Sequence, residues 1–410
     1  MDLAHGLPLA SFAGRKTIDK EIDLLVRRLA SQGFVEYCLG RAGEAEIVIE
    51  PQVPDYWPAI PQLRETDTLV LSRFAYLRRR GDELVLESPR AGALFRICDP
   101  NIAASLALLS SPRQIKNLRR QENFPGPALF ALLLDCRILL KIRAGENGLR
   151  PQEGDANLVL WDFHDLLFHA RSTAGRHANP LGGTYPHSGT IPPLPALRPG
   201  WPGKKIDLGH LPLLPLAKLL RTRHSTRSFD ERRPITLAEL SQFLHATARV
   251  LSTVIDGEGG HAPRPYASAG AAYELELYLS VNACEGLARG FYHYDANGHA
   301  LVPIDVPAQS VEAQLIGAQF AMGAPTAPQI LVTIAARFGR VAWKYSSVAY
   351  ALILKDAGVL MQTFYLVATE MRLGGCAVGI TDIELFAKMT GIEFHVEGPV
   401  GQFALGRPSA

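Results

Sequence analysis

The chain has 410 residues, of which 47% are hydrophobic and 20% charged, a composition typical of a folded protein with two or three domains. Its formal net charge of +2 gives no electrostatic signature of nucleic-acid binding. The five cysteines include no C-x-x-C pair, which argues against a disulfide framework or a thiolate zinc site and suits a reducing cytoplasm.

The N-terminus has no basic stretch followed by an apolar core, so we expect no signal peptide. No uncharged apolar run reaches membrane-spanning length, and the best one, 358–368, is better explained as part of a core helix. His164 and His169 lie five residues apart, whereas two metal ligands on one helix face lie four apart. We therefore expect a protein with no membrane span and no metal site.

Residues 1–63 are predicted to form a first N-terminal module of one helix and two strands. Apolar residues recur at helical spacing over 16–32, and two short β-like runs follow at 35–39 and 46–49. A Pro-rich passage at 51–61 ends this module.

Residues 64–150 are predicted to form a second, winged-helix-like module. Runs at 69–78 and 84–87 flank a turn and predict a hairpin, and a third strand follows at 93–97. Three helices are predicted next, over 102–109, 111–121 and 127–142. The second of these carries basic residues that form either a peptide or nucleic-acid contact or an ordinary solvated face: Arg113, Lys116, Arg119 and Arg120.

Residues 151–210 combine a predicted helix at 161–170 with a Pro- and Gly-rich linker over 175–209. From residue 211 to 410 the pattern predicts an α+β domain. Thr236 and Glu239 have the spacing of a capping box, and Asn297-Gly298 is a hairpin turn signal. The expected helices are 213–220, one starting after Thr236, 350–372 and 381–390, and the expected strands are 273–281, 290–294, 299–303, 329–335 and 401–405.

Four short patterns in this domain could bind a cofactor or take part in catalysis. Each also has a purely structural explanation, as a charged loop, a turn, a helix cap or a surface lysine beside a core aromatic residue. Arginines four apart with a serine between them can donate to one phosphate. Small residues let the backbone approach a flat ring. An adjacent lysine and tyrosine can transfer a proton if their surroundings shift them toward neutral pH. The patterns are Arg223-His224-Ser225-Thr226-Arg227, Ser268-Ala269-Gly270, Gly374-Gly375 and Lys344-Tyr345.

In order and spacing, these patterns resemble the nitroreductase-like flavoproteins. Within that superfamily the chain is most similar to the SagB-type dehydrogenases, the azoline oxidases of thiazole/oxazole-modified peptide clusters. The resemblance also rests on Gly290 to Asp295, Lys355-Asp356-Ala357-Gly358 and Ala404 to Pro408. Upstream, residues 74–78, 86–89 and 165–172 resemble the N-terminal region of the same family, and 1–63 is the least similar part.

The resemblance implies an FMN enzyme that is a homodimer with each flavin at the subunit interface. Lys344 and Tyr345 would then help to remove a proton from the azoline ring while a hydride passes to the flavin. The cofactor residues would be Arg223, Ser225, Arg227 and Arg407 at the phosphate and ribityl chain, with the neighbouring His224, and Ser268, Ala269, Gly270, Gly374 and Gly375 around the isoalloxazine.

The family's N-terminal region resembles winged-helix peptide-recognition elements, which implies a leader-peptide or partner contact on the basic helix. Three departures from the family affect only how the substrate is oriented. Ala267 and Glu274 stand where relatives often have proline, and Val359 stands where they often have histidine.

The sequence therefore predicts an FMN-dependent oxidase that converts thiazoline or oxazoline rings of a ribosomal precursor peptide to thiazole or oxazole, with dioxygen as the electron acceptor. One alternative is an NAD(P)H-dependent nitroreductase-like enzyme acting on small molecules. A second is a non-catalytic scaffold for a cyclodehydratase partner. Lys344 is the predicted base, and Tyr345 would orient or relay the proton.

Overall fold

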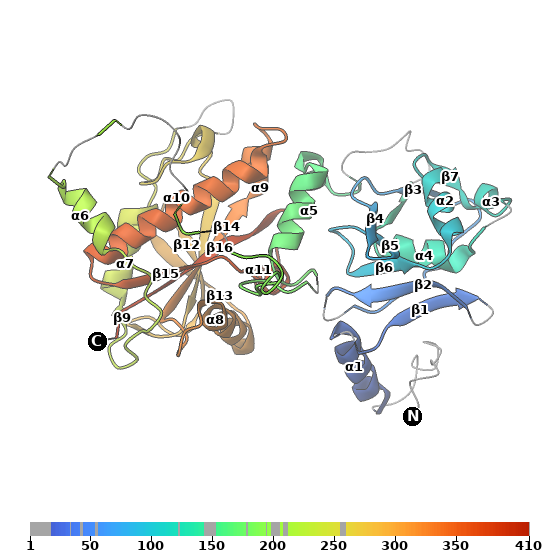
Figure 1. The fold of residues 1–410 in the computed structure, drawn as a ribbon. Helices are drawn as coiled ribbons and strands as arrows, with labels where there is room; N and C mark the ends of the chain where they lie inside the picture. The colour runs from blue at the N-terminus through green and yellow to red at the C-terminus, as the bar shows by residue number, and fades with distance from the viewer. Residues whose placement is uncertain are drawn as a thin grey trace.

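Two lobes meet at the helix α5 (Phe163–Ser172) in the computed structural model (Figure 1). The structure describes residues 18–32, 34–41, 44–53, 56–121, 124–142, 153–177, 179–193, 195–197, 206–207, 212–254 and 260–409. The predicted mixed α+β class is confirmed. The residues before 18, and residues 178, 194, 198–205 and 208–209 of the expected linker, lie outside the described residues.

The N-terminal lobe contains two antiparallel sheets with strand orders β1-β2-β6-β5-β4 and β7-β3-β8. Side chains from both sheets and from the helices form one core, which includes Ile47, Leu69, Phe95 and Phe130. The elements are α1 (Ile18–Ser31), β1 (Tyr37–Arg41), β2 (Glu44–Pro51), β3 (Thr68–Leu71), β4 (Tyr76–Arg80), β5 (Glu83–Glu87), β6 (Ala93–Ile97), α2 (Pro100–Leu108), β7 (Arg113–Gln114), α3 (Ile115–Leu118), α4 (Pro127–Asp135) and β8 (Leu139–Ile142).

Three predictions for this lobe are wrong in detail. The strand expected over 69–78 divides into β3 and β4, which belong to different sheets, because a turn intervenes in which Ala75 N–H donates to Ser72 O at 3.1 Å. The helix expected over 111–121 is reduced to the four residues of α3. The helix expected over 127–142 ends at Asp135, because Arg137 adopts a left-handed conformation (φ 59°) and the chain continues as β8.

The C-terminal lobe is built around a six-stranded antiparallel sheet with the order β13-β12-β10-β14-β16-β15. Alternate residues of the central strand β14 face opposite layers, and both sets are apolar: Ile330, Val332 and Ile334 on one side, Leu331 and Ala335 on the other. The strands are β10 (Leu275–Val281), β12 (Gly290–Asp295), β13 (Ala300–Ile304), β14 (Ile330–Arg337), β15 (Gly374–Val378) and β16 (Glu397–Gly406); a small parallel pair joins β9 (Ile235–Thr236) to β11 (Cys284–Glu285).

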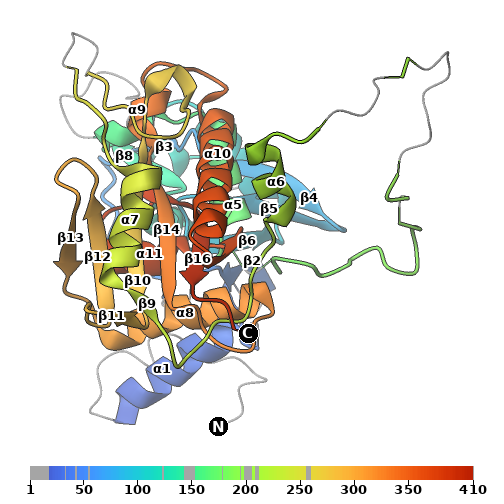
Figure 2. The same ribbon diagram turned by 90° about the vertical axis from the view of Figure 1, so that its left-hand side faces the viewer.

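Helices cover both faces of this sheet (Figure 2). The helices α7 (Leu237–Ala248) and α10 (Ala349–Glu370) pack on one face, and α8 (Ala308–Met322) and α11 (Ile383–Thr390) pack on the other. The predicted capping box of α7 is confirmed. The sequence did not predict α8, the strand β15 or the short helix α9 (Phe338–Ala342).

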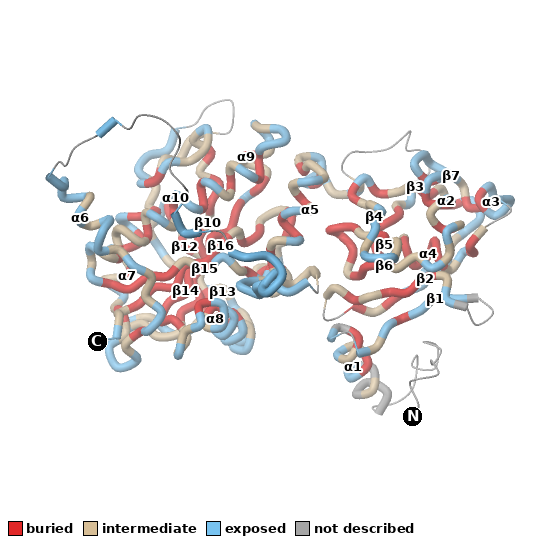
Figure 3. The backbone as a smooth tube through the Cα atoms, in the orientation of Figure 1, coloured by how far each residue is buried: buried red, intermediate tan, exposed pale blue. Residues whose placement is uncertain are grey.

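The helix α10 buries one face against the sheet through residues such as Ile353, Leu360 and Phe364. Among the described helices, it alone has the length and apolar composition of a membrane span, a test that the core helix of a soluble protein also passes. The helix α6 (Pro215–Thr222), which packs on α10, has no buried residue (Figure 3). All five cysteines are free thiols, as predicted.

The segment from 153 to 177 connects the lobes and belongs partly to the C-terminal core. Trp161 Nε1 donates to His395 O at 2.7 Å, and the fully buried His169 Nδ1 lies 3.1 Å from Tyr350 Oη. The Arg176 guanidinium donates to Pro89 O (3.1 Å) and Arg90 O (3.0 Å) of the N-terminal lobe and forms an ion pair with Glu384 of α11. These contacts fix the two lobes against each other.

Candidate active site

The predicted catalytic residues Lys344 and Tyr345 lie in the turn between α9 and α10. Both backbone N–H groups donate to Val341 O, at 3.0 and 2.9 Å, so the end of α9 sets their position. Lys344 Nζ donates to Gly270 O at 3.4 Å. The fold therefore brings the predicted catalytic pair onto the predicted ring-contacting segment Ser268–Gly270, 74 residues away in sequence.

Gly270 has a backbone conformation that favours glycine, and it packs directly against the predicted catalytic pair. Its φ of 55° is left-handed, which L-residues with a side chain rarely adopt. A Cβ at this position would collide with the Tyr345 hydroxyl and lie 3.2 Å from Lys344 Nζ. The absence of a side chain thus lets the pair pack directly on this turn.

The Asp356 side chain, on α10, forms hydrogen bonds to the same turn. Its Oδ2 accepts a hydrogen bond from Ala269 N–H at 2.8 Å and lies 3.0 Å from Ser268 Oγ. Asp356 is buried. Glu274, the residue before β10, is fully buried, and its Oε2 lies 3.2 Å from Ser268 Oγ. These hydrogen bonds join two of the motifs on which the family resemblance rests.

A second group of predicted site residues lies near the C-terminal end of α10. Ser225 Oγ lies 2.8 Å from Tyr365 Oη, which also accepts the N–H of Ala377 at 2.8 Å. The Arg223 guanidinium lies 5.0 Å above the Tyr365 ring. The loop is joined to β15 because Thr226 N–H donates to Gly375 O at 2.9 Å.

This second group can receive an anion. Arg223 and Arg227 form no ion pair within the part of the chain that the structure describes, and Arg227 is exposed, as is His224. Side chains would not fit at the neighbouring glycines, because a Cβ on Gly374 would lie 2.5 Å from Thr226 Cγ2 and one on Gly375 would overlap the Phe403 ring. Two arginines without acidic partners beside a serine hydroxyl fit the phosphate and polyol chain of FMN.

Arg407 is already engaged in the structure. Its Nη2 lies 2.8 Å from both carboxylate oxygens of Glu239, and its backbone N–H donates to Gln329 Oε1 at 2.9 Å. Glu239 also completes the capping box of α7, and these hydrogen bonds outweigh burial and lower the pKa of its carboxyl. Arg407 therefore lies beside the N-terminus of α7, held by Glu239.

Within one chain the predicted site residues form two separate groups. One contacts Asp356 and the other contacts Tyr365, nine positions further along the same helix. At 1.5 Å per residue these contacts are roughly 13 Å apart along α10. The fold gathers Ser268, Ala269, Gly270, Lys344 and Tyr345 in the first group and Arg223, Ser225, Arg227, Gly374 and Gly375 in the second.

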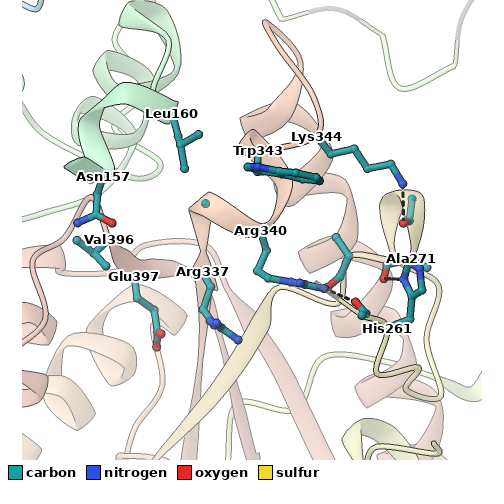
Figure 4. A pocket seen from close by; sticks show the side chains of 14 residues that line it. Asn157, Leu160, His261, Ala271, Arg337, Arg340, Trp343, Lys344, Val396 and Glu397 are labelled. Carbon is teal, nitrogen blue, oxygen red and sulfur yellow. Dashed lines mark hydrogen bonds between the residues drawn. The ribbon is translucent and has the colours of Figure 1, made fainter. Parts of the chain in front are cut away.

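A cavity of about 510 Å³ opens beside the first group (Figure 4). Lys344 and Gly270 line one end, and Asn157 and Leu160 of the connecting segment line the other. Trp343, exposed by 62%, lies along the wall between them (Figure 4). The cavity therefore extends from the predicted catalytic pair to the junction of the two lobes.

Positive groups outnumber negative ones around this cavity. Arg337, Arg340 and Lys344 line it together with one acid, Glu397. Burial raises the pKa of Glu397, whose Oε1 accepts from the Tyr278 hydroxyl at 2.6 Å. Three cationic side chains and one acid therefore give the lining of the cavity an excess of positive charge.

Sequence patterns predicted the residues of both groups but not the side chains that hold them. The sequence motifs include Asp356 without assigning it a role. They also assign no role to Tyr365, Trp343, Arg337 or Arg340. Asp356 carried one usable signal, since an acid within an apolar helical run needs a buried partner. No cluster of three or more potential metal ligands occurs among the described residues.

Both lobes contain regions that match models of known protein families. Residues 69–178 match the model described as cyanobactin oxidase ThcOx, and residues 220–407 match that of the nitroreductase family. A protein of Methanocaldococcus jannaschii named as a nitroreductase, MJ1384, is 31% identical over 175 residues, which cover 43% of this chain and 83% of the relative. The chain belongs to the nitroreductase family. Members of this family bind FMN.

Solved structures that align with part of this chain include a Ralstonia eutropha protein described as a nitroreductase, with 22% identity, a TM-score of 0.38 and coverage of 50% of this chain and 88% of that one. A chain of the Escherichia coli microcin synthetase McbBCD complex with truncated pro-MccB17 bound has 19% identity and a TM-score of 0.46, over 65% of this chain and all of that one.

The two family matches make this nitroreductase-family chain an oxidoreductase of the cyanobactin-oxidase kind. The predicted relationship to azoline oxidases of modified-peptide pathways is thereby confirmed. Residues 153–177, which supply the far end of the cavity, fall within the cyanobactin-oxidase match, whereas the predicted catalytic pair falls within the nitroreductase match.

Proposed function

We propose that this chain oxidises azoline rings in a ribosomally made peptide to azoles, with FMN as its cofactor and Lys344 as the base. One structural observation carries the assignment of the site. Lys344 Nζ rests on Gly270 O at the mouth of a cavity that both matched regions line. A cavity of about 510 Å³ is large enough for a heterocycle with its flanking peptide groups.

The residues of the site supply positioning and proton transfer. Bound FMN would supply the redox chemistry by accepting two electrons, and dioxygen would be the final acceptor. Lys344 Nζ, in its neutral form, removes the proton that leaves a ring carbon, and Tyr345 orients the amine or relays the proton. Trp343 offers a flat, exposed face for the heterocycle or its neighbours. Loss of two hydrogens makes the ring aromatic, so the enzyme needs mainly geometry and a base.

We propose that the second group of site residues holds the FMN phosphate and ribityl chain. The support is the pair Arg223 and Arg227, without acidic partners among the described residues, together with the Ser225 hydroxyl and the side-chain-free edge at Gly374 and Gly375. Arg407 would assist from beside α7 while keeping its contact with Glu239.

We propose a homodimer in which each flavin site draws on both subunits. The two groups of site residues lie on different parts of α10, so a single chain does not close one compact site around them. Apolar side chains are exposed on α6 and on the outer face of α10, which indicates a surface that a second copy covers: Leu214 (74%), Leu216 (58%), Leu220 (43%) and Val359 (40%).

We propose that the N-terminal lobe, of winged-helix type, recognises the leader part of the precursor peptide or a cyclodehydratase partner. Its basic surface around α3 is exposed, although Arg119 pairs with Glu65 at 2.9 Å. Charge reversal at Arg113 and Arg119 should weaken peptide or partner binding. Unchanged affinity would remove this role.

The experiment that tests the catalytic proposal is incubation of the purified protein with FMN and a synthetic thiazoline-containing peptide in air. Mass spectrometry should show a product that has lost two hydrogens and absorbs as a thiazole. Absence of this product with flavin-loaded protein would contradict the proposal.

A further inference from the structure

Two carboxyl groups meet one hydroxyl beneath the turn that carries Gly270. Ser268 Oγ lies 3.0 Å from Asp356 Oδ2 and 3.2 Å from Glu274 Oε2, and it accepts a hydrogen bond from Tyr273 N–H at 2.9 Å. Glu274 has no exposed surface and Asp356 is 6% exposed. This cluster lies within the protein, directly under the residues that contact Lys344.

A count of protons shows what this geometry requires. A serine hydroxyl has one proton and can donate it to only one of the two carboxyl groups. Two ionised carboxylates would therefore leave one buried oxygen facing Ser268 Oγ without a donor, which is costly. If one carboxyl keeps its proton, it donates to Ser268 Oγ and every contact around the hydroxyl is satisfied.

Glu274 is the better place for that proton. Asp356 also accepts Ala269 N–H, which favours its charged form. Glu274 Oε1, by contrast, is buried and has no hydrogen-bond partner among the described residues. Burial raises the pKa of Glu274 to about 7, and repulsion from Asp356 acts in the same direction.

The other charged groups around Glu274 do not prevent its carboxyl from keeping the proton. Arg264, from the preceding loop, acts to lower its pKa, but the Arg264 guanidinium is committed to Leu275 O and to Glu276 at 3.3 Å. Burial raises the pKa of the neighbouring Tyr266, which keeps this phenol neutral. Arg337, from β14, meets Glu274 through its backbone N–H, which donates to Glu274 O at 3.0 Å.

We propose that Glu274 and Asp356 share one proton across Ser268, and that this proton holds the turn on which Lys344 and Tyr345 rest. The inference depends on the proposed function only for its catalytic consequence. Glu274 is then a positioning residue. When Glu274 ionises, Ser268 Oγ can hydrogen-bond to only one of the two carboxylates. The turn that carries Gly270 then becomes less rigid, and Gly270 O no longer holds the Lys344 amine in position.

The first test is independent of catalysis. Infrared spectra of the full-length protein at pH 6 should contain the carbonyl band of a buried protonated carboxyl. Glu274→Gln should remove this band. Glu312→Gln, at an exposed carboxyl of α8, is the control and should keep the band. A wild-type minus Glu274→Gln difference spectrum that lacks this band would overturn the proposal.

The second test measures the pH dependence of flavin reduction by a thiazoline-containing peptide. Only the neutral amine of Lys344 acts as the base, so the rates of all variants share the same dependence on Lys344 ionisation, which cancels in a ratio of two rates. The wild-type rate divided by the Glu274→Gln rate should fall about tenfold per pH unit above about pH 7, because Glu274 must stay protonated whereas the glutamine amide donates to Ser268 at every pH. The wild-type rate divided by the Glu312→Gln rate should not change with pH. A ratio of wild-type to Glu274→Gln rates that does not change with pH would overturn the positioning role. If the infrared band behaves as expected but no variant reacts with the peptide, the shared proton stands and the proposed function fails.

Discussion

Lys344 Nζ lies 3.4 Å from the carbonyl oxygen of Gly270, a residue 74 positions earlier in the chain. This contact places the only amine at that end of the cavity, among the residues described as lining it, on a turn fixed by Ser268, Ala269 and Asp356. A base needs such a fixed position, because proton transfer requires hydrogen-bond distance to the reacting group.

Lys344→Ala should keep bound flavin and lose turnover. Lys344 contributes the proposed base and no contact to the Arg223–Arg227 loop, and loss of a general base typically costs about 10²- to 10⁴-fold in rate. The measurements are flavin absorbance after gel filtration and the rate of peptide oxidation. Lys388→Ala, at an exposed lysine of α11, is the control and should keep both. Loss of flavin together with activity would make Lys344 a cofactor-binding or structural residue.

Gly270→Ala should abolish peptide oxidation, because the new methyl group would displace the Tyr345 hydroxyl. Gly391→Ala is a matched control, since Gly391 also has a positive φ (71°) but nothing lies within 4 Å of its added Cβ. Each substitution should cost about 1 to 2 kcal/mol in the free energy of unfolding for the left-handed backbone. Only Gly270→Ala should lose activity under conditions in which both variants are folded. Equal activity in the two variants would show that the Tyr345 contact has no catalytic role.

Arg223→Ala should weaken FMN binding by about 1.5 to 3 kcal/mol, the range for hydrogen bonds to charged groups. Titration of flavin-free protein with FMN, followed by fluorescence quenching, measures this change. Arg232→Ala removes an exposed arginine outside the proposed site and should leave the affinity as it is. Equal affinities for the two variants would move the phosphate site away from the 223–227 loop.

Mixing Arg223→Ala with Lys344→Ala, at an FMN concentration too low to load Arg223→Ala, tests whether a flavin site draws on both subunits. If the Arg223 group of one chain and the Lys344 group of its partner form one site, a heterodimer of Arg223→Ala and Lys344→Ala contains one site with neither lesion. Unfolding and refolding the two variants together should therefore restore oxidation, whereas refolding either one alone should not. A mixture as inactive as its components would place both groups of one site in the same subunit.

Much of the C-terminal lobe could be predicted because local patterns there agree with the tertiary structure. The alternation in β10, the capping box at Thr236 and the Asn297-Gly298 turn each determine an element locally, and all three were found. The strand β15 was missed, because its Gly374-Gly375 start carries no β-propensity and exists through pairing with β16.

The N-terminal lobe was less predictable, because similar apolar runs form strands of different sheets. Nothing in the run from Leu69 to Arg78 shows that the chain leaves one sheet at Leu71 and enters another at Tyr76. The end of α4 depends on one left-handed residue, Arg137, of a type that usually continues a helix.

The residues of the candidate site also divide into those that local sequence patterns predict and those that they do not. Motifs identified the residues that would touch cofactor and substrate, since their chemistry is local. The residues that hold them, such as Asp356 and Tyr365, act through contacts between segments about 90 and 140 residues apart, and no spacing rule reaches that far.

The most direct test of the account is anaerobic addition of a thiazoline-containing peptide to flavin-loaded protein while the flavin absorbance is recorded. The account predicts that the yellow colour bleaches with the peptide, returns on admission of air, and does not bleach with NAD(P)H. Bleaching by NAD(P)H but not by the peptide would contradict azoline oxidation and indicate a reductase of small molecules. A purified protein that takes up no FMN at all would contradict the catalytic account and favour a scaffold.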